Sequence, residues 1–426
     1  MFDFIFYHTP IFYLIQSVWR DEAFSYFMAR PNPFQVVINT ASDFNPPLYY
    51  LLLHFWINIF GKSDEILRLL SLIPHLLTVY VVYLFAIKLF SKRFAIFVAI
   101  FTLFNPMLLY YAFEMRMYSF YALFTLCSVY FFYLKNWKWY TTASVLGLYT
   151  HSFFPLIIAS FLVYLWKTSE FKKKTIIYTL KPLLFYLPWL PVLVAQFLHS
   201  ANSWMFPVDI QLITSVLGNL FTNYEGTPGN WWNYTAILSG FILLFLLLAF
   251  KNKRKEARLF LTPIFIPLFL ILGYSLLRRP IYVNRYLIFI TIFEIMGVSL
   301  GIWVIKNKIL KYASIILWLI FIIYFNIQIV PYHKKADFKG TFMEINKLAK
   351  DGDLVFTKTP IAYLESAYYN RQTNNTFIYN PNNIAVPNYI GINVVFPNIS
   401  KASFPPSPSR TFLVFDDASY EMIIQK

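Results

Sequence analysis

Hydrophobic and polar residues alternate along this chain in long blocks, with apolar stretches of about 15–25 residues separated by short polar or basic stretches. An apolar helix of this length spans the hydrocarbon core of a bilayer. The pattern predicts a mainly α, polytopic membrane protein with about 11 transmembrane helices. The apolar segments lie at residues 2–19, 66–90, 94–111, 117–134, 138–150, 152–167, 175–197, 233–250, 258–277, 281–304 and 309–330.

The composition supports this interpretation. Hydrophobic residues make up 58% of the 426 residues and charged residues only 13%, and the mean hydropathy is +0.54. Soluble domains carry about 25% charged residues, so a cytosolic globular protein and a disordered chain are excluded. The single cysteine, Cys127, lies in an apolar run, which excludes a disulfide framework and a thiolate metal site.

Two apolar stretches need separate interpretation. The first begins at Met1 with no basic flank and no cleavage site, which favours an anchor over a signal peptide. Because the chain opens so abruptly on this segment, we expect a cytoplasmic N-terminal piece to be missing before it. The second stretch, 46–60, would place the basic residues of 88–93 on the outer face if it were a full span. We therefore predict a re-entrant or interfacial segment there.

Basic residues give the orientation. The formal charge of +16 would suggest nucleic acid in a soluble chain, but in a membrane protein Lys and Arg are retained in cytoplasmic loops. A basic face also suits membrane lipids with anionic headgroups, and we expect no nucleic-acid partner. The basic clusters fall in every second loop, at 88–93, 135–138, 167–174, 251–258 and 306–311. This alternation places loop 20–65 and the tail after residue 330 outside the cell.

The tail differs in composition from the rest of the chain. Polar residues and Asn/Pro turns appear after residue 330, and the runs of apolar residues become shorter. We predict two parts: a transmembrane domain, 1–330, with a catalytic outer loop at 20–65, and a small soluble α/β domain, 331–426. The expected tail elements are a helix with Phe338, Phe342, Ile345 and Leu348 on one face, a helix at 361–369, and strands at 353–357, 376–379 and 411–415.

The first candidates for a functional site are acids at the outer face. Ionisable residues beside membrane segments cost free energy, so their presence indicates a function. Asp21 and Glu22 follow the first apolar segment directly and would point about 100° apart on a helix. A catalytic carboxylate and a helix-start acid pair that balances Arg20 are equally good interpretations. The later run from Asp43 through Asn45 to Pro47 forms a rigid turn, for which a plain helix start is the better interpretation.

Basic and aromatic residues form three further candidates. Glu114, Arg116 and Tyr118 lie at an outer turn, where Arg116 either clamps a phosphate or pairs with Glu114 inside an aromatic belt. His151 separates two short apolar segments, and a structural hydrogen-bonding role is favoured there over a base or ligand. The third group consists of Arg278, Arg279, Tyr282, Arg285 and Tyr286. They gather at the outer end of two apolar segments, although basic residues normally stay on the cytoplasmic side. Contact with a lipid phosphate is slightly favoured over snorkelling for that group.

Other functions are weighed against surface chemistry. The chain has no Ser-His-Asp pattern and no cluster of His or Cys with metal-ligand spacing. It also has only 12 glycines and no glycine-rich phosphate loop, which argues against ATP hydrolysis. The main alternative is a transporter or flippase of a lipid-linked saccharide, for which Glu294 is the main buried acid. The remaining acids gather at one face, which favours catalysis there. A structural subunit is the third possibility, and the acid-rich outer loop argues against it.

Taken in order, the motifs resemble the GT-C membrane glycosyltransferases. They are similar to the branch of protein O-mannosyltransferases and aminoarabinose transferases (glycosyltransferase family 39-like), over most of the chain and most strongly over 19–160. The motifs are Asp21-Glu22, Pro46-Pro47-Leu48-Tyr49-Tyr50, Gly61-Lys-Ser-Asp-Glu65-Ile-Leu-Arg68-Leu, Glu114-Met-Arg116-Met-Tyr118, Tyr149-Thr-His151, Arg285-Tyr286 and Asp337-Phe-Lys with Gly352-Asp353-Leu-Val.

This resemblance implies a multi-span enzyme that takes sugar from a polyprenyl-phosphate carrier at the outer face. It assigns Asp21 as the base, Glu22 as its companion and Glu114 to a second acidic turn. Asn45 departs from the family, whose members often have a basic residue or His there. The positions implied in substrate binding are Asp43, Asn45, Arg116, Tyr118, His151, Arg285 and Tyr286.

The expected chemistry is a single inverting displacement. A carboxylate deprotonates the acceptor hydroxyl, which attacks the anomeric carbon while lipid phosphate leaves. Two means of stabilising that phosphate fit the sequence: the guanidinium groups of Arg116 and Arg285, or a divalent cation held by Asp21 and Glu22. The donor is a hexose or pentose on a lipid phosphate, and a glycan, a lipid or a protein remains open as the acceptor.

Overall fold

The computed structural model describes residues 2–199, 205, 207–226, 229–387 and 390–425. The chain divides into two compact units. The first, here called the helical unit, holds residues up to Ile11, Phe44–Tyr49 and Arg68–Tyr332. The second, here called the loop–tail unit, holds Phe12–Asp43, Tyr50–Leu67 and the chain from His333 onward. By contacts, therefore, the outer loop and the tail form one unit; the sequence-based boundary at residue 330 stays a prediction.

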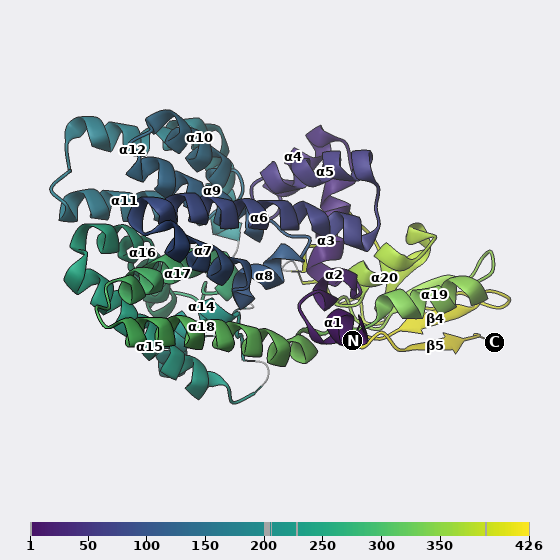
Figure 1. Ribbon diagram of the computed structural model, residues 1–426. Helices are drawn as coiled ribbons and strands as arrows, with labels where there is room; N and C mark the ends of the chain where they lie inside the picture. The colour runs from purple at the N-terminus through teal and green to yellow at the C-terminus, as the bar shows by residue number, and fades with distance from the viewer. Residues whose placement is uncertain (1, 200–204, 206, 227–228, 388–389, 426) are drawn as a thin grey trace. The chain divides into compact units, whose positions relative to one another are not determined.

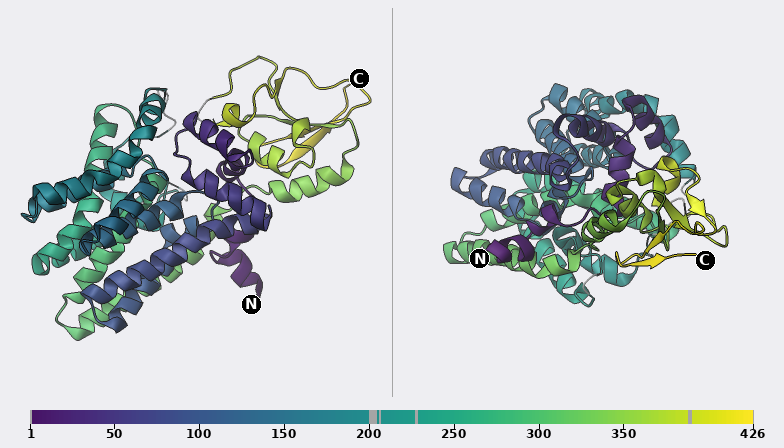
Figure 2. Two further views of the ribbon diagram at one scale, coloured as in Figure 1. Left: turned by 90° about the horizontal axis from the view of Figure 1, so that it is seen from above. Right: turned by 90° about the vertical axis from the view of Figure 1, so that its right-hand side faces the viewer.

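The helical unit is a bundle whose helices run alongside one another (Figures 1 and 2). Its elements are α1 (Phe2–His8), most of α6 (Asp64–Leu89), α7 (Lys92–Leu103), α8 (Pro106–Ala112), α9 (Tyr118–Tyr133), α10 (Trp137–Leu148), α11 (Pro155–Lys167), α12 (Lys173–Tyr186), η1 (Leu187–Trp189), α13 (Leu190–His199), α14 (Ile210–Thr222), α15 (Trp232–Asn252), α16 (Arg254–Leu277), η2 (Asn284–Leu287), α17 (Ile288–Trp303) and α18 (Lys308–Ile329).

Six helices of the described residues are long and apolar enough to cross a membrane, or seven if the bent pair α7 and α8 counts as one span. Shorter apolar helices accompany them at α5 (Leu48–Phe60), α9, α11 and α14. The predicted class, a mainly α multi-pass membrane protein with a small C-terminal sheet, is confirmed. The predicted number of about 11 spans stays a prediction.

Helix α17 forms the centre of the helical unit. Every residue from Ile288 to Ile302 is buried, because the helix is apolar on all sides and packs against α7, α9, α14, α15, α16 and α18. Gly301 allows α15 to approach closely, since a Cβ atom there would lie 2.2 Å from the carbonyl oxygen of Phe245.

Proline residues break two of the predicted apolar segments. A single helix over 2–19 does not form: α1 ends at His8 and α2 (Phe12–Ile15) begins after Pro10, which has no N–H for a continuous helix. The segment 94–111 bends by 59° between α7 and α8. Pro106 begins α8 there, and the Asn105 side chain caps the N–H of Leu108 at 3.1 Å. The split between α10 and α11 at His151 is confirmed.

The loop–tail unit contains a five-stranded sheet of order β3-β2-β1-β4-β5. The pairs β3–β2, β2–β1 and β1–β4 are parallel, and the pair β4–β5 is antiparallel. Apart from α2 and α5, the elements of the unit are α3 (Arg20–Ala29), α4 (Pro33–Ala41), η3 (Val330–His333, partly), α19 (Phe338–Leu348), β1 (Leu354–Thr357), α20 (Tyr363–Tyr369), η4 (Thr373–Asn375), β2 (Thr376–Tyr379), α21 (Ile392–Val395), β3 (Ser400–Lys401), β4 (Thr411–Val414) and β5 (Tyr420–Ile423).

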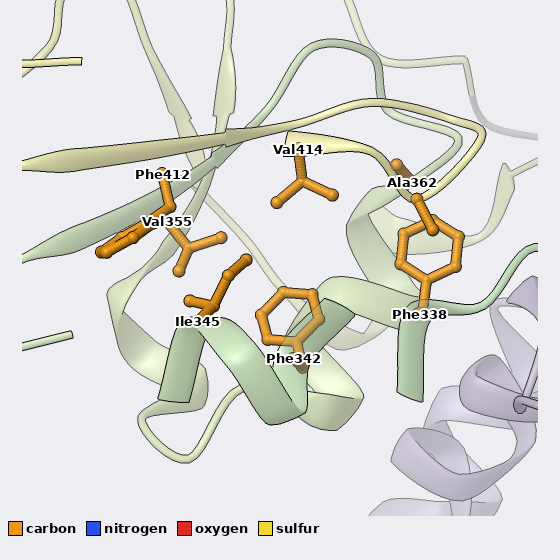
Figure 3. Packing of buried hydrophobic residues seen from close by; sticks show 8 residues of the cluster. Phe338, Phe342, Ile345, Val355, Ala362, Phe412 and Val414 are labelled. Atoms are coloured by element: carbon orange, nitrogen blue, oxygen red, sulfur yellow. The ribbon is translucent and has the colours of Figure 1, made fainter. Parts of the chain in front are cut away.

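Helix α19 covers one face of this sheet. Phe338, Phe342 and Ile345 point from the helix onto Val355 of β1 and Phe412 of β4 (Figure 3). These helix positions are spaced by three or four residues, as one face of a helix requires. The predicted helices and strands of the tail are therefore confirmed, with small shifts at their ends. Leu348, which shares the predicted face, ends the helix and is exposed.

The outer loop packs on the tail through α3. The ring of Phe27 contacts that of Phe396 with centroids 4.7 Å apart, and Tyr26 contacts Tyr368 at 5.0 Å. Gly391 has a φ of +78°, and a Cβ atom there would lie 2.6 Å from the ring of Phe24. A glycine is therefore required for both the backbone conformation and the close approach of the tail to α3.

Candidate active site

In the helical unit, an aromatic cluster surrounds His151, which lies in the turn between α10 and α11. The His151 ring stacks on Tyr121 of α9, with centroids 4.4 Å apart and planes 6° apart. Tyr286 lies 5.4 Å from His151, and Tyr118 lies 6.3 Å from it, between ring centroids. Three segments far apart in the sequence thus meet at one histidine.

Two arginines border this cluster. The guanidinium carbon of Arg116 lies 5.8 Å from the ring centroid of Tyr118, and that of Arg285 lies 5.7 Å from the ring centroid of Tyr286. Both arrangements are of the cation–π type. Arg285 also forms an ion pair with Glu225 at 3.9 Å. The structure therefore brings together the predicted residues Arg116, Tyr118, His151, Arg285 and Tyr286.

Main-chain hydrogen bonds fix the turn that carries Glu114 and Arg116. The N–H of Arg116 donates to the carbonyl oxygen of Glu114 at 2.7 Å, and the Ser71 hydroxyl donates to the carbonyl of Arg116 at 3.2 Å. The Ser119 hydroxyl donates to the carbonyl of Tyr111 at 2.9 Å. Glu114 and Arg116 are both buried. Glu114 also lies within electrostatic reach of Tyr111, together with Glu225 and Arg285.

The environment of His151 keeps its ring neutral. Burial and, secondarily, the positive charge of Arg116 lower the pKa of His151 to about 3. At physiological pH the ring is therefore an uncharged stacking and hydrogen-bonding group. Its Nδ1 accepts a hydrogen bond from the N–H of Phe153 at 3.1 Å, while Nε2 is buried with no partner among the described residues.

The Pro-Pro segment is attached to the same turn. The N–H of Leu48 donates to the carbonyl of Tyr149 at 3.0 Å, and the Ser152 hydroxyl donates to the carbonyl of Phe44 at 3.0 Å. Asn45 lies in this segment and is partly exposed. These two bonds connect the predicted binding position Asn45 to the turn of His151.

The other predicted acids lie in the loop–tail unit. Asp21 and Glu22 occupy the first turn of α3, and Asp43 is buried after the end of α4. Asp21 is partly exposed and pairs with the guanidinium of its neighbour Arg20 at 3.5 Å. Glu22 is buried, and its Oε2 accepts a hydrogen bond from the N–H of Trp19 at 3.3 Å. The two carboxylates thus differ: Glu22 holds the helix start, while Asp21 is the more accessible.

The described residues contain no group of three or more His, Cys, Asp or Glu side chains placed to hold a metal ion. Asp21 and Glu22 supply two carboxylates, which is fewer than the donor set of a typical divalent-cation site. A role for a cation stays a prediction from the sequence.

Sequence reasoning missed several residues of these sites. Tyr121 was hidden in a uniformly apolar segment, and only its spacing of three from Tyr118 could have placed it on the same helix face. Glu225 pairs with Arg285 across some 60 residues, and such a long-range pair leaves no local signal in the sequence. Glu365 is a lone acid within an apolar helical stretch, and that pattern could have indicated a buried carboxyl.

Comparison with known proteins finds one family model that overlaps part of this site. Residues 45–195 match the family model described as dolichyl-phosphate-mannose-protein mannosyltransferase. The matched range contains Asn45, Glu114, Arg116, Tyr118 and His151. No curated protein sequence matches the chain.

Solved structures show the same fold at low sequence identity. ArnT from Cupriavidus metallidurans in the apo state matches with a TM-score of 0.59 and 11% identity, covering 94% of this chain and 89% of that one. The same protein bound to undecaprenyl phosphate matches with a TM-score of 0.62 and 12% identity, covering 95% of this chain and 91% of that one. An oligosaccharyltransferase from Archaeoglobus fulgidus, tethered with an acceptor peptide, matches with a TM-score of 0.50 and 12% identity, covering 87% of this chain and 64% of that one.

The resemblance inferred from the sequence motifs is confirmed. Residues 45–195 match the mannosyltransferase family model, and the chain shares the fold of ArnT. None of these matches is to a transporter, so none of them supports the transporter alternative.

Proposed function

We propose that this chain transfers one hexosyl or pentosyl group from a polyprenyl-phosphate carrier to an acceptor hydroxyl at the extracytoplasmic face of the membrane. The observation that carries the proposal is the site around His151, which is bordered by two arginines. His151, Tyr118 and Arg116 lie within the range that matches the family model. A protein of the same fold has been solved with undecaprenyl phosphate bound, which is the class of carrier proposed here.

The proposed reaction is a single displacement. The carboxylate of Asp21 takes the proton of the acceptor hydroxyl, and the resulting oxygen forms a bond to the anomeric carbon. The bond from that carbon to the phosphate oxygen breaks, and the polyprenyl phosphate leaves with the electron pair. Attack from the face opposite the leaving group inverts the anomeric configuration.

Arg116 and Arg285 are proposed to stabilise the leaving phosphate. A guanidinium donates two parallel hydrogen bonds to phosphate oxygens and keeps its charge at any physiological pH. Such donors act most strongly where charge develops in the transition state. The ion pair of Arg285 with Glu225 at 3.9 Å holds that guanidinium before the donor binds.

Aromatic rings complete the proposed donor site. Tyr118 and Tyr286 lie with ring centroids 6.5 Å apart, and each also lies beside the neutral ring of His151, at 6.3 Å and 5.4 Å between centroids. Their faces suit the apolar face of a sugar ring or the first isoprene unit of the carrier. Glu114, Asp43 and Asn45 are proposed to contact donor or acceptor hydroxyl groups.

The orientation rests on the basic loops. The clusters at 88–93, 135–138, 167–174, 251–258 and 306–311 are proposed to be cytoplasmic, which places loop 20–65 and the C-terminal domain outside. The acceptor is a glycan, a lipid or a protein of the cell envelope.

The test is a donor panel with the purified chain in lipid vesicles. Polyprenyl-phosphate hexoses and pentoses carrying a radiolabelled sugar are incubated with a cell-envelope acceptor fraction, and labelled acceptor and free polyprenyl phosphate are quantified. We expect equal amounts of both products from one donor, with inverted configuration, and none from the matched polyprenyl-diphosphate sugar. Retained configuration, or movement of intact donor between leaflets without cleavage, would overturn the proposal.

A further inference from the structure

A buried acid of the C-terminal domain lies outside the site described so far. Glu365 on α20 is 6% exposed and is flanked by the buried residues Leu364 and Ser366. Its Oε2 atom is buried and has no hydrogen-bond partner among the described residues. A buried polar atom without a partner destabilises a fold, so its presence calls for a function.

Glu365 contacts the start of the helix that carries Asp21. Helix α20 packs against α3, and the Glu365 carboxyl group accepts a hydrogen bond from the main-chain N–H of Arg20. Arg20 is the first residue of α3, where N–H groups have no partner within the helix. The carboxyl group also lies within electrostatic reach of the Arg20 and Asp21 side chains.

Two carboxyl groups therefore hold the first turn of α3. Glu22 binds the N–H of Trp19 from within the helix, and Glu365 binds the N–H of Arg20 from the C-terminal domain. Asp21 lies between Arg20 and Glu22 in this turn, so its orientation depends on how both neighbours are held.

The protonation of Glu365 suits this contact. Burial raises the pKa of Glu365 to about 8, and the negative charge of Asp21 adds a smaller increase. Hydrogen bonds from the N–H groups of Glu365 and Arg20, and the positive charge of Arg20, lower the pKa by less than burial raises it. At neutral pH the group is largely uncharged and does not repel the Asp21 carboxylate. Glutamine is then its closest replacement, because it keeps the accepting oxygen, whereas methionine keeps the volume alone.

We propose that Glu365 is a positioning residue for glycosyl transfer: it fixes the first turn of α3 and so directs the Asp21 carboxylate towards the acceptor hydroxyl. This inference rests on the proposed function. It gives the C-terminal domain a part in catalysis, because the group that orients the base belongs to that domain.

The experiment compares Glu365→Gln and Glu365→Met in the full-length chain in vesicles, at equal amounts of folded protein. We expect Glu365→Met to lower kcat at least about tenfold with donor KM unchanged, since small misplacement of a reacting group has a large effect on rate. Glu365→Gln should stay within about twofold of wild type. In an Asp21→Asn background, Glu365→Met should lower the residual transfer no further, because the group that it positions is already inactive.

The outcomes separate this inference from the proposed function. Equal kcat for Glu365→Met and wild type, or an equal loss in both backgrounds, would overturn the positioning role. If wild type transfers sugar from no donor, the proposed function fails. Amide hydrogen exchange of Arg20–Glu22 then still tests whether Glu365 holds the first turn of α3. Faster exchange in Glu365→Met than in Glu365→Gln supports the contact with Arg20, and equal exchange contradicts it.

Discussion

The imidazole ring of His151 lies flat against the phenol ring of Tyr121, with ring centroids 4.4 Å apart and planes 6° apart. The contact joins the turn after α10 to the first turn of α9. Because Leu48 and Ser152 also connect the Pro-Pro segment to this turn, the stack fixes the position of Asn45 as well. A neutral ring is required for this packing, since a buried imidazolium would have no compensating acid in the stack.

The neutral state of His151 predicts a pH dependence of stability. Its pKa is lowered to about 3 in the folded chain, against an ordinary value of about 6.5 after unfolding. Between these values the unfolded chain binds a proton that the folded chain does not. Stability is therefore full above about pH 6.5 and declines as the pH falls towards 3, by about 2 kcal/mol at pH 5.

Thermal unfolding of wild type and His151→Phe in detergent at pH 7 and pH 5 measures this effect. Phenylalanine keeps the stacking but cannot be protonated, so the variant should lose less stability than wild type between the two pH values. All other titrating groups are shared by the two proteins. An equal loss in both would show that His151 does not account for the difference.

Arg116 and Arg285 should be sensitive even to conservative replacement. Substitution by lysine keeps the charge but removes the planar pair of donors, and we expect each Arg→Lys variant to lose about tenfold in kcat. Arg→Gln variants should lose about a hundredfold or more. Sugar transfer in vesicles is the measurement, and Arg254→Gln on the exposed basic loop is the matched control. Full activity in Arg285→Gln would exclude it from phosphate binding.

Asp64 should be important for the stability of the loop–tail unit. Its carboxylate accepts hydrogen bonds from the hydroxyls of Tyr368 at 3.0 Å and Tyr369 at 2.7 Å, and it pairs with Lys339 at 3.2 Å. Asp64→Ala removes both tyrosine hydrogen bonds and the Lys339 ion pair of this carboxylate and should lower the free energy of unfolding by about 1–3 kcal/mol. Protease resistance and melting temperature measure this change. The exposed ion pair of Glu65 offers a control, since Glu65→Gln should have an effect below about 1 kcal/mol.

Gly391 offers a separate test of the packing between the tail and α3. Alanine there would need an unfavourable left-handed conformation, at about 1–2 kcal/mol, and its Cβ would collide with Phe24. We expect Gly391→Ala to destabilise the loop–tail unit and to lower transfer in parallel, because α3 carries Asp21. Gly240→Ala, where nothing lies within 4 Å, should leave both unchanged. Normal melting and activity in Gly391→Ala would show that this contact is dispensable.

The sequence was sufficient for features that depend on local patterns. Apolar blocks located most of the helices, and the period of Phe338, Phe342 and Ile345 located α19, because burial of one face leaves a repeating signal. The break after Phe104 was missed although Asn105-Pro106 is a strong helix-start signal. The edge strand β5 was also missed, because its residues are largely exposed and show no apolar alternation.

The candidate site was predictable in its residue types but not in its contacts. Arg116, His151 and Tyr286 stood out because polar residues are scarce in membrane segments. Their meeting around His151 depends on helix packing over more than 160 residues, which no short pattern encodes. The contact between Arg20 and Glu365 joins positions over 340 residues apart, so only the folded chain reveals that the tail supports the turn of Asp21.

The central claim is that Asp21 is the base in sugar transfer, with Glu22 in a supporting position. The most direct measurement is transfer of radiolabelled sugar from polyprenyl-phosphate donors in isolated membranes, with wild type, Asp21→Asn, Glu22→Gln and the exposed control Glu344→Gln side by side. We predict a loss of at least about a hundredfold for Asp21→Asn. Glu22→Gln keeps an acceptor for the Trp19 N–H and should lose less than about tenfold, while Glu344→Gln should match wild type. Undiminished transfer by folded Asp21→Asn would contradict this account.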